Sequence, residues 1–458
     1  MVLAVLLTVL QINAESNEVS DDVIEQLQKD ALSSDLAWNI LASLTSEVGA
    51  RMGGTEGDER AVKWAVDKMH SLGFDRVWTE PVTFPRWVRR SESATVLTPG
   101  PQSLAVTAIG GSPATGGPLK GEVIHFGSLE ALEAAANEDV QGKIVFLSTR
   151  MLKTRKGKGY GETVVNRSRG PFVAASKGAS ALLIRSVGTD SDRLPHTGMM
   201  SGSEPGDRVP SAALSNPDAD NLMIMLKRQG PVMIQLDLDV GFEGEATSYN
   251  VVGEFDGREG HKKFVLLGAH LDSWDLGTGA VDDGAGVAIV MAAAKLVSKL
   301  SVRPQHCTRV VLYANEEQGV YGGKAYAKLH EPDIDNHLVG AESDLGADRI
   351  YRFKTRVSPQ AEPTIALLAR HLKGLGIEHE KTEMAGGGAD VGQMRKLGMP
   401  VIDLNQDASR YFDLHHTAND TLDKVDPEQL RQNLAAWVTL VYLAANSPVE
   451  FGPVEPFK

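Results

Sequence analysis

The stretch Phe264-Val-Leu-Leu-Gly-Ala-His-Leu-Asp-Ser-Trp-Asp275 combines two features that together predict the fold. Its first four residues, 264–267, form an uninterrupted apolar run, which is typical of a strand buried on both faces. His270 and Asp272 follow this run almost at once. In open α/β sheets, ligands bind at the carboxyl ends of the strands. The stretch therefore predicts a central strand that ends at a functional site.

Downstream of this strand, apolar runs and helical stretches alternate to the end of the chain. Further strands are predicted at 308–314, 337–341 and 400–404. Helices are predicted at 286–300, 322–329, 363–375 and 427–445. Strands that alternate with helices form βαβ units, in which helices cover both faces of the sheet. We therefore predict an α/β fold over residues 244–458, with a mixed, mostly parallel sheet sandwiched by helices.

Two regions precede this part of the chain. Residues 15–90 contain helical patterns, one of them from about Glu59 to Leu72 with Gly73 just past its end, and we assign them to the same domain. The following region has a different sequence pattern. Its short β-like runs lie at 121–126, 142–147 and 181–184, and glycine- and proline-rich segments separate them. This change predicts a small separate domain, residues 91–243, inserted into the larger one.

The chain begins with an apolar run from Val2 to Leu10. This run is too short to span a bilayer and fits the hydrophobic region of a secretory signal, so residues 1–14 are predicted to be a signal peptide. A buried N-terminal strand or helix is the alternative. We expect an exported protein that is secreted, periplasmic or lysosomal, depending on its source. The single cysteine, Cys307, excludes an internal disulfide.

The formal net charge of the 458 residues is −14. Nucleic acids and anionic membranes bind basic surfaces, so neither is an expected partner. The basic run from Lys153 to Lys158 is interpreted as a solvated loop. Beyond the leader, no run is apolar enough to span a membrane. We therefore expect a soluble mature protein.

Carboxylates and imidazoles follow the predicted strands where they end. They are His270 and Asp272 after the first strand, Asp282 and Asp283 before the next helix, Glu316 and Glu317 after the second strand, Asp344 after the third, and His415 and His416 after the last. Because the carboxyl ends of parallel strands meet at one edge of a sheet, we expect these side chains to share one rim.

Imidazoles and carboxylates without thiolates suit Zn²⁺ or a similar divalent ion that keeps a bound water. The acidic groups outnumber what one tetrahedral ion can use. A two-metal site, with one carboxylate bridging ions roughly 3.5–4 Å apart, would use all of them. Cations also make such crowding of negative charge tolerable, since unpaired buried carboxylates would otherwise protonate.

Residue spacing suggests two further roles. Adjacent side chains of a strand point to opposite sides, so if Glu316 and Glu317 leave a strand, they should differ in role. One of the two should bind metal, and the other should act as general base. Asp272 lies two residues after His270 and points to the same side, so its carboxylate can orient the imidazole ring.

Five segments resemble those of a known family, and they occur in the family's order. They are Gly268-Ala-His-Leu-Asp272, Asp282-Asp-Gly-Ala-Gly286, Asn315-Glu-Glu-Gln-Gly319, Glu342-Ser-Asp344 and His415-His-Thr-Ala-Asn-Asp-Thr421. Together they resemble the di-zinc exopeptidases, the family of the zinc aminopeptidases and glutamate carboxypeptidase. Ser273-Trp-Asp275 and Arg86-Trp87 resemble one branch of this family in particular.

The resemblance implies two zinc ions per chain. The implied ligands are His270 and Asp344 for one ion, Glu317 and His416 for the other, and Asp282 as the bridge between them. The family places its ligand directly before Thr or Ser, which favours His416 over His415. Asp283 is interpreted as a helix N-cap or an acid in the first turn of a helix, not as a ligand. His196 is interpreted as structural or substrate-facing.

The resemblance also implies the chemistry. Glu316 would be the general base and Asp272 the orienting carboxylate. The enzyme would hydrolyse dipeptides, or the N-terminal residues of short peptides, with a metal-activated water. The inserted domain would be a protease-associated domain, and the chain could form a homodimer. The alternatives are a hydrolase of another amide, such as an acylated amino acid, a cyclising glutaminyl transferase, or a receptor without activity, which the complete set of ligands disfavours.

Overall fold

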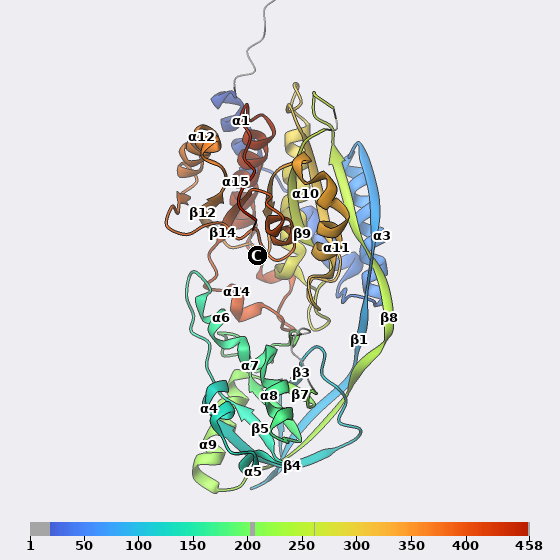
Figure 1. Cartoon of the computed structure of the whole chain (residues 1–458), viewed down its shortest axis with the longest axis vertical. Coiled ribbons are helices and arrows are strands. Elements are labelled where there is room, and N and C mark those ends of the chain that lie inside the picture. The colour runs from blue at the N-terminus through green and yellow to red at the C-terminus, as the bar shows by residue number, and fades with distance from the viewer. Residues whose placement is uncertain (1–18, 202–206, 261, 457–458) are drawn as a thin grey trace, which may run out of the picture.

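The computed structural model describes residues 19–201, 207–260 and 262–456, so the predicted signal peptide, 1–14, lies outside the described residues. The molecule is elongated and has two bodies, one above the other in Figure 1. The upper body contains the N-terminal helices and most of the C-terminal half of the chain. The lower body consists of residues 102–229, which we call the insert, and of the adjoining ends of two long strands.

The centre of the upper body is a mixed sheet. Its central strands run parallel in the order β14 (Val401–Gln406), β11 (His337–Glu342), β9 (Phe264–His270) and β10 (Cys307–Tyr313). Antiparallel neighbours flank this core: β12 (Ile350–Arg356) pairs with β14, and β8 (Met233–Phe255) pairs with β10. The short β13 (Glu378–His379) lies parallel to β12 at the edge. The predicted mixed, mostly parallel sheet is therefore confirmed.

Strand β9 shows why an unbroken apolar run becomes the middle of this sheet. Every residue of β9 is buried. Val265 and Leu267 pack into the hydrophobic cluster on one face, whereas Leu266 packs into the cluster on the other face. Successive side chains of a strand point to opposite faces, so a strand between two helical layers must be apolar at every position.

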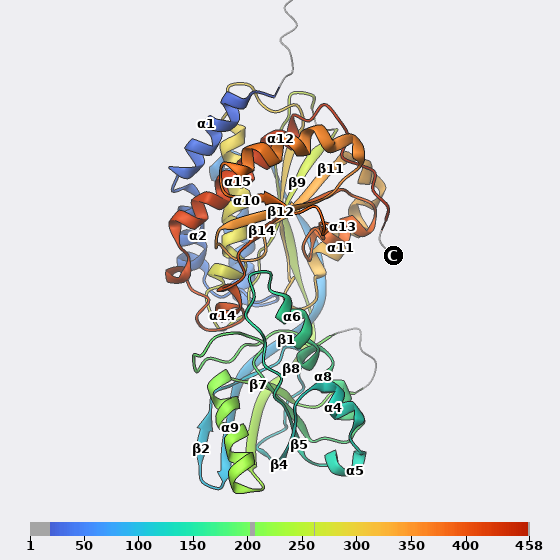
Figure 2. The same ribbon diagram turned by 90° about the vertical axis from the view of Figure 1, so that its left-hand side faces the viewer.

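Helices cover both faces of the sheet, as Figure 2 shows. The larger layer consists of α1 (Asp21–Leu32), α2 (Leu36–Ser43), α3 (Glu56–Leu72), α10 (Ala285–Ser298), α12 (Glu362–Lys373) and α15 (Pro427–Ala445). The opposite layer consists of α11 (Tyr321–His330) and α13 (Val391–Lys396). Among the described residues, no helix has the length and apolar character needed to cross a membrane.

The longest strands of the molecule were not predicted. β1 (Arg76–Thr98) and β8 pair antiparallel along nearly their whole lengths and form a ribbon that runs from the upper body into the lower one. Pro81 and Pro85 interrupt the sequence pattern of β1, and much of the strand alternates buried and exposed positions. The ribbon is stabilised by pairing between residues more than 130 positions apart, which local patterns do not reveal.

The insert contains a smaller sheet with its own hydrophobic cluster. Its strands are β3 (Val106–Ala108), β4 (Leu119–Phe126), β5 (Ile144–Leu147), β6 (Ala181–Arg185) and β7 (Ser211–Leu214), whereas β2 (Gln102–Leu104) pairs with β1. Its helices are α4 (Leu129–Ala134), α5 (Asn137–Val140), α6 (Lys158–Thr163), α7 (Val165–Ser168), α8 (Gly170–Ser176) and α9 (Asn216–Gln229). The strands β4 to β7 are parallel, and β4 also pairs with β8.

Both sheets are therefore continuous through β8, and β1 and β8 run through the boundaries predicted at residues 90 and 243. The division into domains at those residues, and the identity of the insert as a protease-associated domain, stay predictions. The top of the insert faces the loops that follow the central strands of the upper body (Figure 1).

Candidate active site

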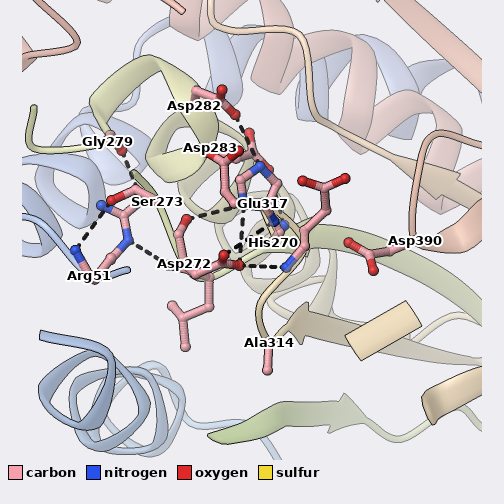
Figure 3. A network of polar contacts seen from close by, with 12 residues as sticks. Arg51, His270, Asp272, Ser273, Gly279, Asp282, Asp283, Ala314, Glu317 and Asp390 are labelled. Carbon is pink, nitrogen blue, oxygen red and sulfur yellow. Dashed lines mark hydrogen bonds and ion pairs between the residues drawn. The ribbon is translucent and has the colours of Figure 1, made fainter. Parts of the chain in front are cut away.

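The carboxyl ends of β9, β10 and β11 face one cavity of about 300 Å³. The loop before α10 and the segment that follows α14 (Tyr411–Leu414) close it from the side. The lining residues from the upper body are Asp282, Glu316, Glu317, Asp344, Leu345, Tyr411, Phe412, His415 and His416. His270 and Asp272 are buried and lie beside Asp282 and Glu317 (Figure 3). The structure thus brings all seven predicted site residues together.

A first group of possible ligands forms around His270, the last residue of β9. Its Nε2 atom lies 3.0 Å from Asp282 Oδ1 and 3.5 Å from Asp344 Oδ1. These three ligand atoms all lie within 4.8 Å of one another, which is close enough for one cation to contact all three. Asp344 follows β11, so the group joins two neighbouring strands and the loop before α10.

A second group forms around His416. Its Nε2 atom lies 2.9 Å from Glu317 Oε2 and 3.3 Å from Asp282 Oδ2. Asp282 therefore directs one carboxylate oxygen to each group and lies between them. The ring of His415 stacks on that of His416, and its Nε2 atom lies 3.6 Å from Asp282 Oδ2. Both histidines are within reach of a cation at this position.

These side chains fit a divalent cation. Oε1 of Glu317 is buried and has no hydrogen-bond partner, although most buried polar atoms in proteins are paired. Burial raises the pKa of the carboxyls of Glu316 and Glu317, and it does the same for Asp344. Closely packed carboxylates that face imidazole nitrogens, with an unpaired oxygen among them, form a donor set that suits Zn²⁺.

Asp272 connects the two halves of the site. Its backbone oxygen lies 3.1 Å from His270 Nδ1, and its carboxylate lies 3.6 Å from the same atom. The carboxylate also accepts hydrogen bonds from the backbone N–H groups of Glu316 (2.9 Å) and Glu317 (3.3 Å). The backbone oxygen of Asp272 is thus the hydrogen-bond partner of the imidazole, and the orienting role of its carboxylate stays a prediction. The carboxylate holds the turn that carries both glutamates.

That turn differs from the geometry assumed for Glu316 and Glu317. β10 ends at Tyr313, and Asn315 has a positive φ of 50°, so the two glutamates do not continue the strand. Their side chains are nevertheless separated. Glu317 is directed to His416, whereas Glu316 faces the cavity. Asp283 contributes elsewhere, because its carboxylate accepts hydrogen bonds from the N–H groups of His270 and Gly286, the latter in the first turn of α10.

Two further residues that support the site were missed. Arg51 is fully buried and donates hydrogen bonds to the backbone oxygens of Leu271, Thr278 and Gly279, which fixes the loop between His270 and Asp282 (Figure 3). The carboxylate of Asp420 accepts hydrogen bonds from the N–H groups of Val281 (2.6 Å) and Asp282 (3.1 Å). The glycine-rich loop around Arg51 is visible in the sequence, but nothing local indicates what its arginine contacts.

The insert supports the site from below. His196 is buried, and its Nε2 atom lies 2.6 Å from Asp190 Oδ1. The neighbouring Thr197 makes two backbone hydrogen bonds with His416. Its N–H donates to the backbone oxygen of His416 (3.0 Å), and its backbone oxygen accepts from His416 Nδ1 (3.2 Å). Such a bond leaves Nε2 free to bind a metal.

The structure therefore shows His196 in a structural role, which is one of the two interpretations of its position in the sequence. Its ring is enclosed between Asp190, the backbone of His415 and the glycine at 188. His196 is not one of the described residues that line the cavity.

Comparisons with known proteins agree with this geometry. Residues 250–441 match the model of Peptidase family M28. Carboxypeptidase Q of Xenopus laevis is 34% identical over 415 residues, which cover 90% of this chain and 86% of that protein. Carboxypeptidase Q is the branch that Ser273-Trp-Asp275 and Arg86-Trp87 indicated. The predicted enzyme class, a metallopeptidase, is supported by both matches.

Solved structures extend the match to the whole fold. A peptidase M28 precursor from Shewanella amazonensis is 49% identical, has a TM-score of 0.92, and the match covers 95% of this chain and 99% of that one. A zinc aminopeptidase from Bacillus subtilis shares the fold at 19% identity, with a TM-score of 0.65 and coverage of 92% and 97%. By the extent and identity of these matches, the chain belongs to peptidase family M28.

Proposed function

We propose that this chain is a di-zinc exopeptidase that hydrolyses dipeptides or removes N-terminal residues from short peptides. One observation carries the proposal: Asp282 directs one carboxylate oxygen to His270 and the other to His416. A carboxylate placed between two imidazole-containing groups is the arrangement expected of a bridge between two metal ions.

The residues would divide between two ions. His270 and Asp344 would hold one ion, Glu317 and His416 would hold the other, and Asp282 would contact both. His415 is a further candidate beside His416. When bound, a zinc pair supplies Lewis acidity, which lowers the pKa of a water towards neutrality and polarises a carbonyl group.

Glu316 is the general base in this proposal. Its carboxyl faces the cavity and makes up part of its wall, and its backbone N–H is held by Asp272. Burial raises the pKa of the Glu316 carboxyl, and a carboxylate that faces the cavity can accept a proton from a bound water and return it. Glu316 would accept the proton of the attacking water and transfer it to the nitrogen of the leaving amine.

The cavity explains why a small substrate with free ends is favoured. Its volume of about 300 Å³ lies at the lower end of the roughly 300–1,000 Å³ of small-molecule pockets. Its wall carries Asp282, Glu316, Glu317 and Asp344. These carboxylates, or the metal ions that they hold, can bind the α-amino group of a peptide.

Substrate screening with and without a chelator tests the proposal. A library of dipeptides, tripeptides and N-acylated amino acids would be incubated with the zinc-loaded protein, and the products would be identified by mass spectrometry. We expect chelator-sensitive release of amino acids from peptides with a free N-terminus. Cleavage confined to N-acylated amino acids would favour the alternative, a hydrolase of another amide. No chelator-sensitive cleavage of any member would reject the function.

Two remaining expectations belong to the same proposal. Export is supported by the apolar N-terminal run, 2–10, and by a relative that is described as a precursor. A homodimer is expected from the family resemblance. Light scattering of the purified protein and N-terminal sequencing of the protein recovered from its source would check these two expectations separately.

A further inference from the structure

One arginine of the insert lies at the wall of the cavity without an acidic partner. Arg167, on α7, is 6% exposed and lines the cavity together with Tyr160 and Met199 of the insert. Among the described residues that line the cavity, it is the one arginine or lysine. Within the described ranges, no aspartate or glutamate forms an ion pair with it, and its Nε atom has no hydrogen-bond partner.

The guanidinium of Arg167 is held in place by neutral groups. Nη2 donates a hydrogen bond to the hydroxyl of Tyr160 (2.6 Å), and Nη1 donates one to the backbone oxygen of Thr197 (3.1 Å). Nη1 also lies 3.5 Å from Nδ1 of His416. Arg167 is therefore fixed beside a candidate metal ligand, with a positive charge that the protein itself does not neutralise by contact.

The surrounding residues are arranged to leave room for this guanidinium. Gly198 has a φ of 128°, and a Cβ atom there would lie 2.2 Å from Nη1 of Arg167 and 2.7 Å from Nδ1 of His416. A larger residue would therefore displace either side chain. The ring of Tyr160 stacks on Phe412 of the upper body at 5.0 Å, so the two bodies jointly position the hydroxyl that holds Arg167.

A buried cation without a counter-ion is costly unless a ligand supplies the negative charge. The wall of the cavity is acidic on the side of the upper body and carries Arg167 on the side of the insert. A dipeptide has the complementary charges, an ammonium at one end and a carboxylate at the other. Guanidinium groups bind carboxylates with planar, charge-assisted hydrogen bonds.

We propose that Arg167 binds the free α-carboxylate of a dipeptide substrate and thereby selects for a free C-terminus. This inference rests on the proposed peptidase function and adds a specificity-determining residue to it. The insert would then take part in substrate recognition, since Arg167, Tyr160 and Gly198 all belong to it.

The first test needs no mutation. The zinc-loaded protein would be assayed with a dipeptide and with the same dipeptide as its C-terminal amide, which retains the amino group and the scissile bond. We expect kcat/KM for the free acid to exceed that for the amide by about 10- to 100-fold, the range for a lost hydrogen bond to a charged group. Equal kcat/KM for the two substrates would overturn the inference.

The second test separates recognition from structural support. Arg167→Gln should lower kcat/KM for the free acid by about 10- to 100-fold and change that for the amide by less than about threefold. A purely structural role would lower both values equally, and this outcome would reject the proposal. Arg169→Gln is the matched control, because Arg169 is close in sequence but is half-exposed and pairs with Glu133 on the surface.

Two outcomes need a further variant or control. If Arg167→Gln loses zinc or does not fold, Arg167→Lys takes its place. Lysine retains the charge, so this variant should keep part of the preference for the free acid over the amide. The proposal would be rejected if Arg167→Lys folded, lost about 10-fold in activity on both substrates and left the ratio between acid and amide unchanged. If the unmodified protein cleaves neither substrate in a chelator-sensitive manner, the proposed function itself fails, and the inference fails with it.

Discussion

Nδ1 of His196 lies 2.7 Å from the backbone oxygen of His415 and donates a hydrogen bond to it, so a residue of the insert holds the backbone directly before the candidate ligand His416. The other ring nitrogen faces Asp190. Both ring nitrogens therefore have an oxygen partner, and the ring is fixed in place. The position of His416 therefore depends on a part of the chain more than 200 residues earlier.

Replacing this histidine should weaken metal binding. His196→Phe keeps a ring of similar size but removes both hydrogen bonds, and we expect the affinity for zinc to fall by about 10- to 100-fold, as for other residues that position metal ligands. Competition with a chelator of known affinity measures the change. His125→Phe is the matched control, because His125 lies in β4 of the insert and bonds to Ser148. Equal zinc affinity of the two variants would contradict the expectation.

Arg51→Lys tests the support on the opposite side of the site. The guanidinium of Arg51 donates to four backbone oxygens, and the ammonium of a lysine cannot reproduce this planar arrangement. Leaving a buried carbonyl unpaired costs about 1–3 kcal/mol, so the free energy of unfolding should fall by at least about 2 kcal/mol. Denaturant unfolding in the presence of a chelator measures it. Arg60→Lys on the exposed face of α3 should change it by less than about 0.5 kcal/mol.

Much of the upper body could be predicted from sequence because its elements carry local signals. The helix predicted at 427–445 is observed with those bounds, since Asp426 caps it, Pro427 begins it and its apolar residues continue for four turns. β9 contains the apolar run 264–267 and β11 the run 338–341, and ligands lie at or just after the ends of these strands. A residue whose role depends on its place at a strand end can therefore be recognised before the structure is known.

The supporting residues could not be predicted, because their partners are distant in sequence. Arg51 bonds to backbone oxygens about 220 positions later, and backbone oxygens have no sequence signature. His196 and Thr197 act through the backbone of 415–416. The spacing rule for Glu316 and Glu317 assumed a strand, whereas the chain had already turned at Asn315. Local patterns predict the ligands of the site but not the contacts that orient them.

His337 should make stability depend on pH independently of the active site. It begins β11, and burial, with the nearby charge of Arg309, lowers its pKa from 6.5 to about 3. Between pH 6.5 and about 3, His337 is therefore protonated in the unfolded chain but neutral in the folded chain. This contribution to stability is complete above pH 6.5 and is lost progressively as the pH falls towards 3.

The size of this effect can be measured by comparison with a variant. Each pKa unit corresponds to about 1.4 kcal/mol, so between pH 7 and pH 4.5 the contribution should fall by about 3 kcal/mol. His337→Gln should remove this part of the pH dependence, whereas His70→Gln, on an exposed position of α3, should leave it intact. Unfolding by urea at several pH values, with chelator present throughout, gives the comparison. Identical pH profiles for all three proteins would show that His337 does not contribute.

The adjacent glutamates allow the sharpest test of the proposed mechanism, because the same chemical change one residue apart should have opposite effects. Glu316→Gln removes the proton acceptor that faces the cavity but leaves the contacts of Glu317 with His416. It should retain two zinc ions per chain and lose nearly all activity, at least about 10²- to 10⁴-fold in kcat. Full activity of Glu316→Gln would reject its role as general base.

Glu317→Gln should instead reduce the zinc content, because the neutral amide replaces a charged ligand whose Oε2 lies 2.9 Å from His416 Nε2. Its activity should recover in part when zinc is added in excess, whereas that of Glu316→Gln should not, since excess metal cannot replace a missing base. Elemental analysis of both variants after dialysis, followed by dipeptide hydrolysis at increasing zinc concentrations, separates the two roles. If both variants retained two ions and lost activity equally, Glu317 would not be a ligand, and the assignment of the second ion would have to pass to His415 and His416 with Asp282.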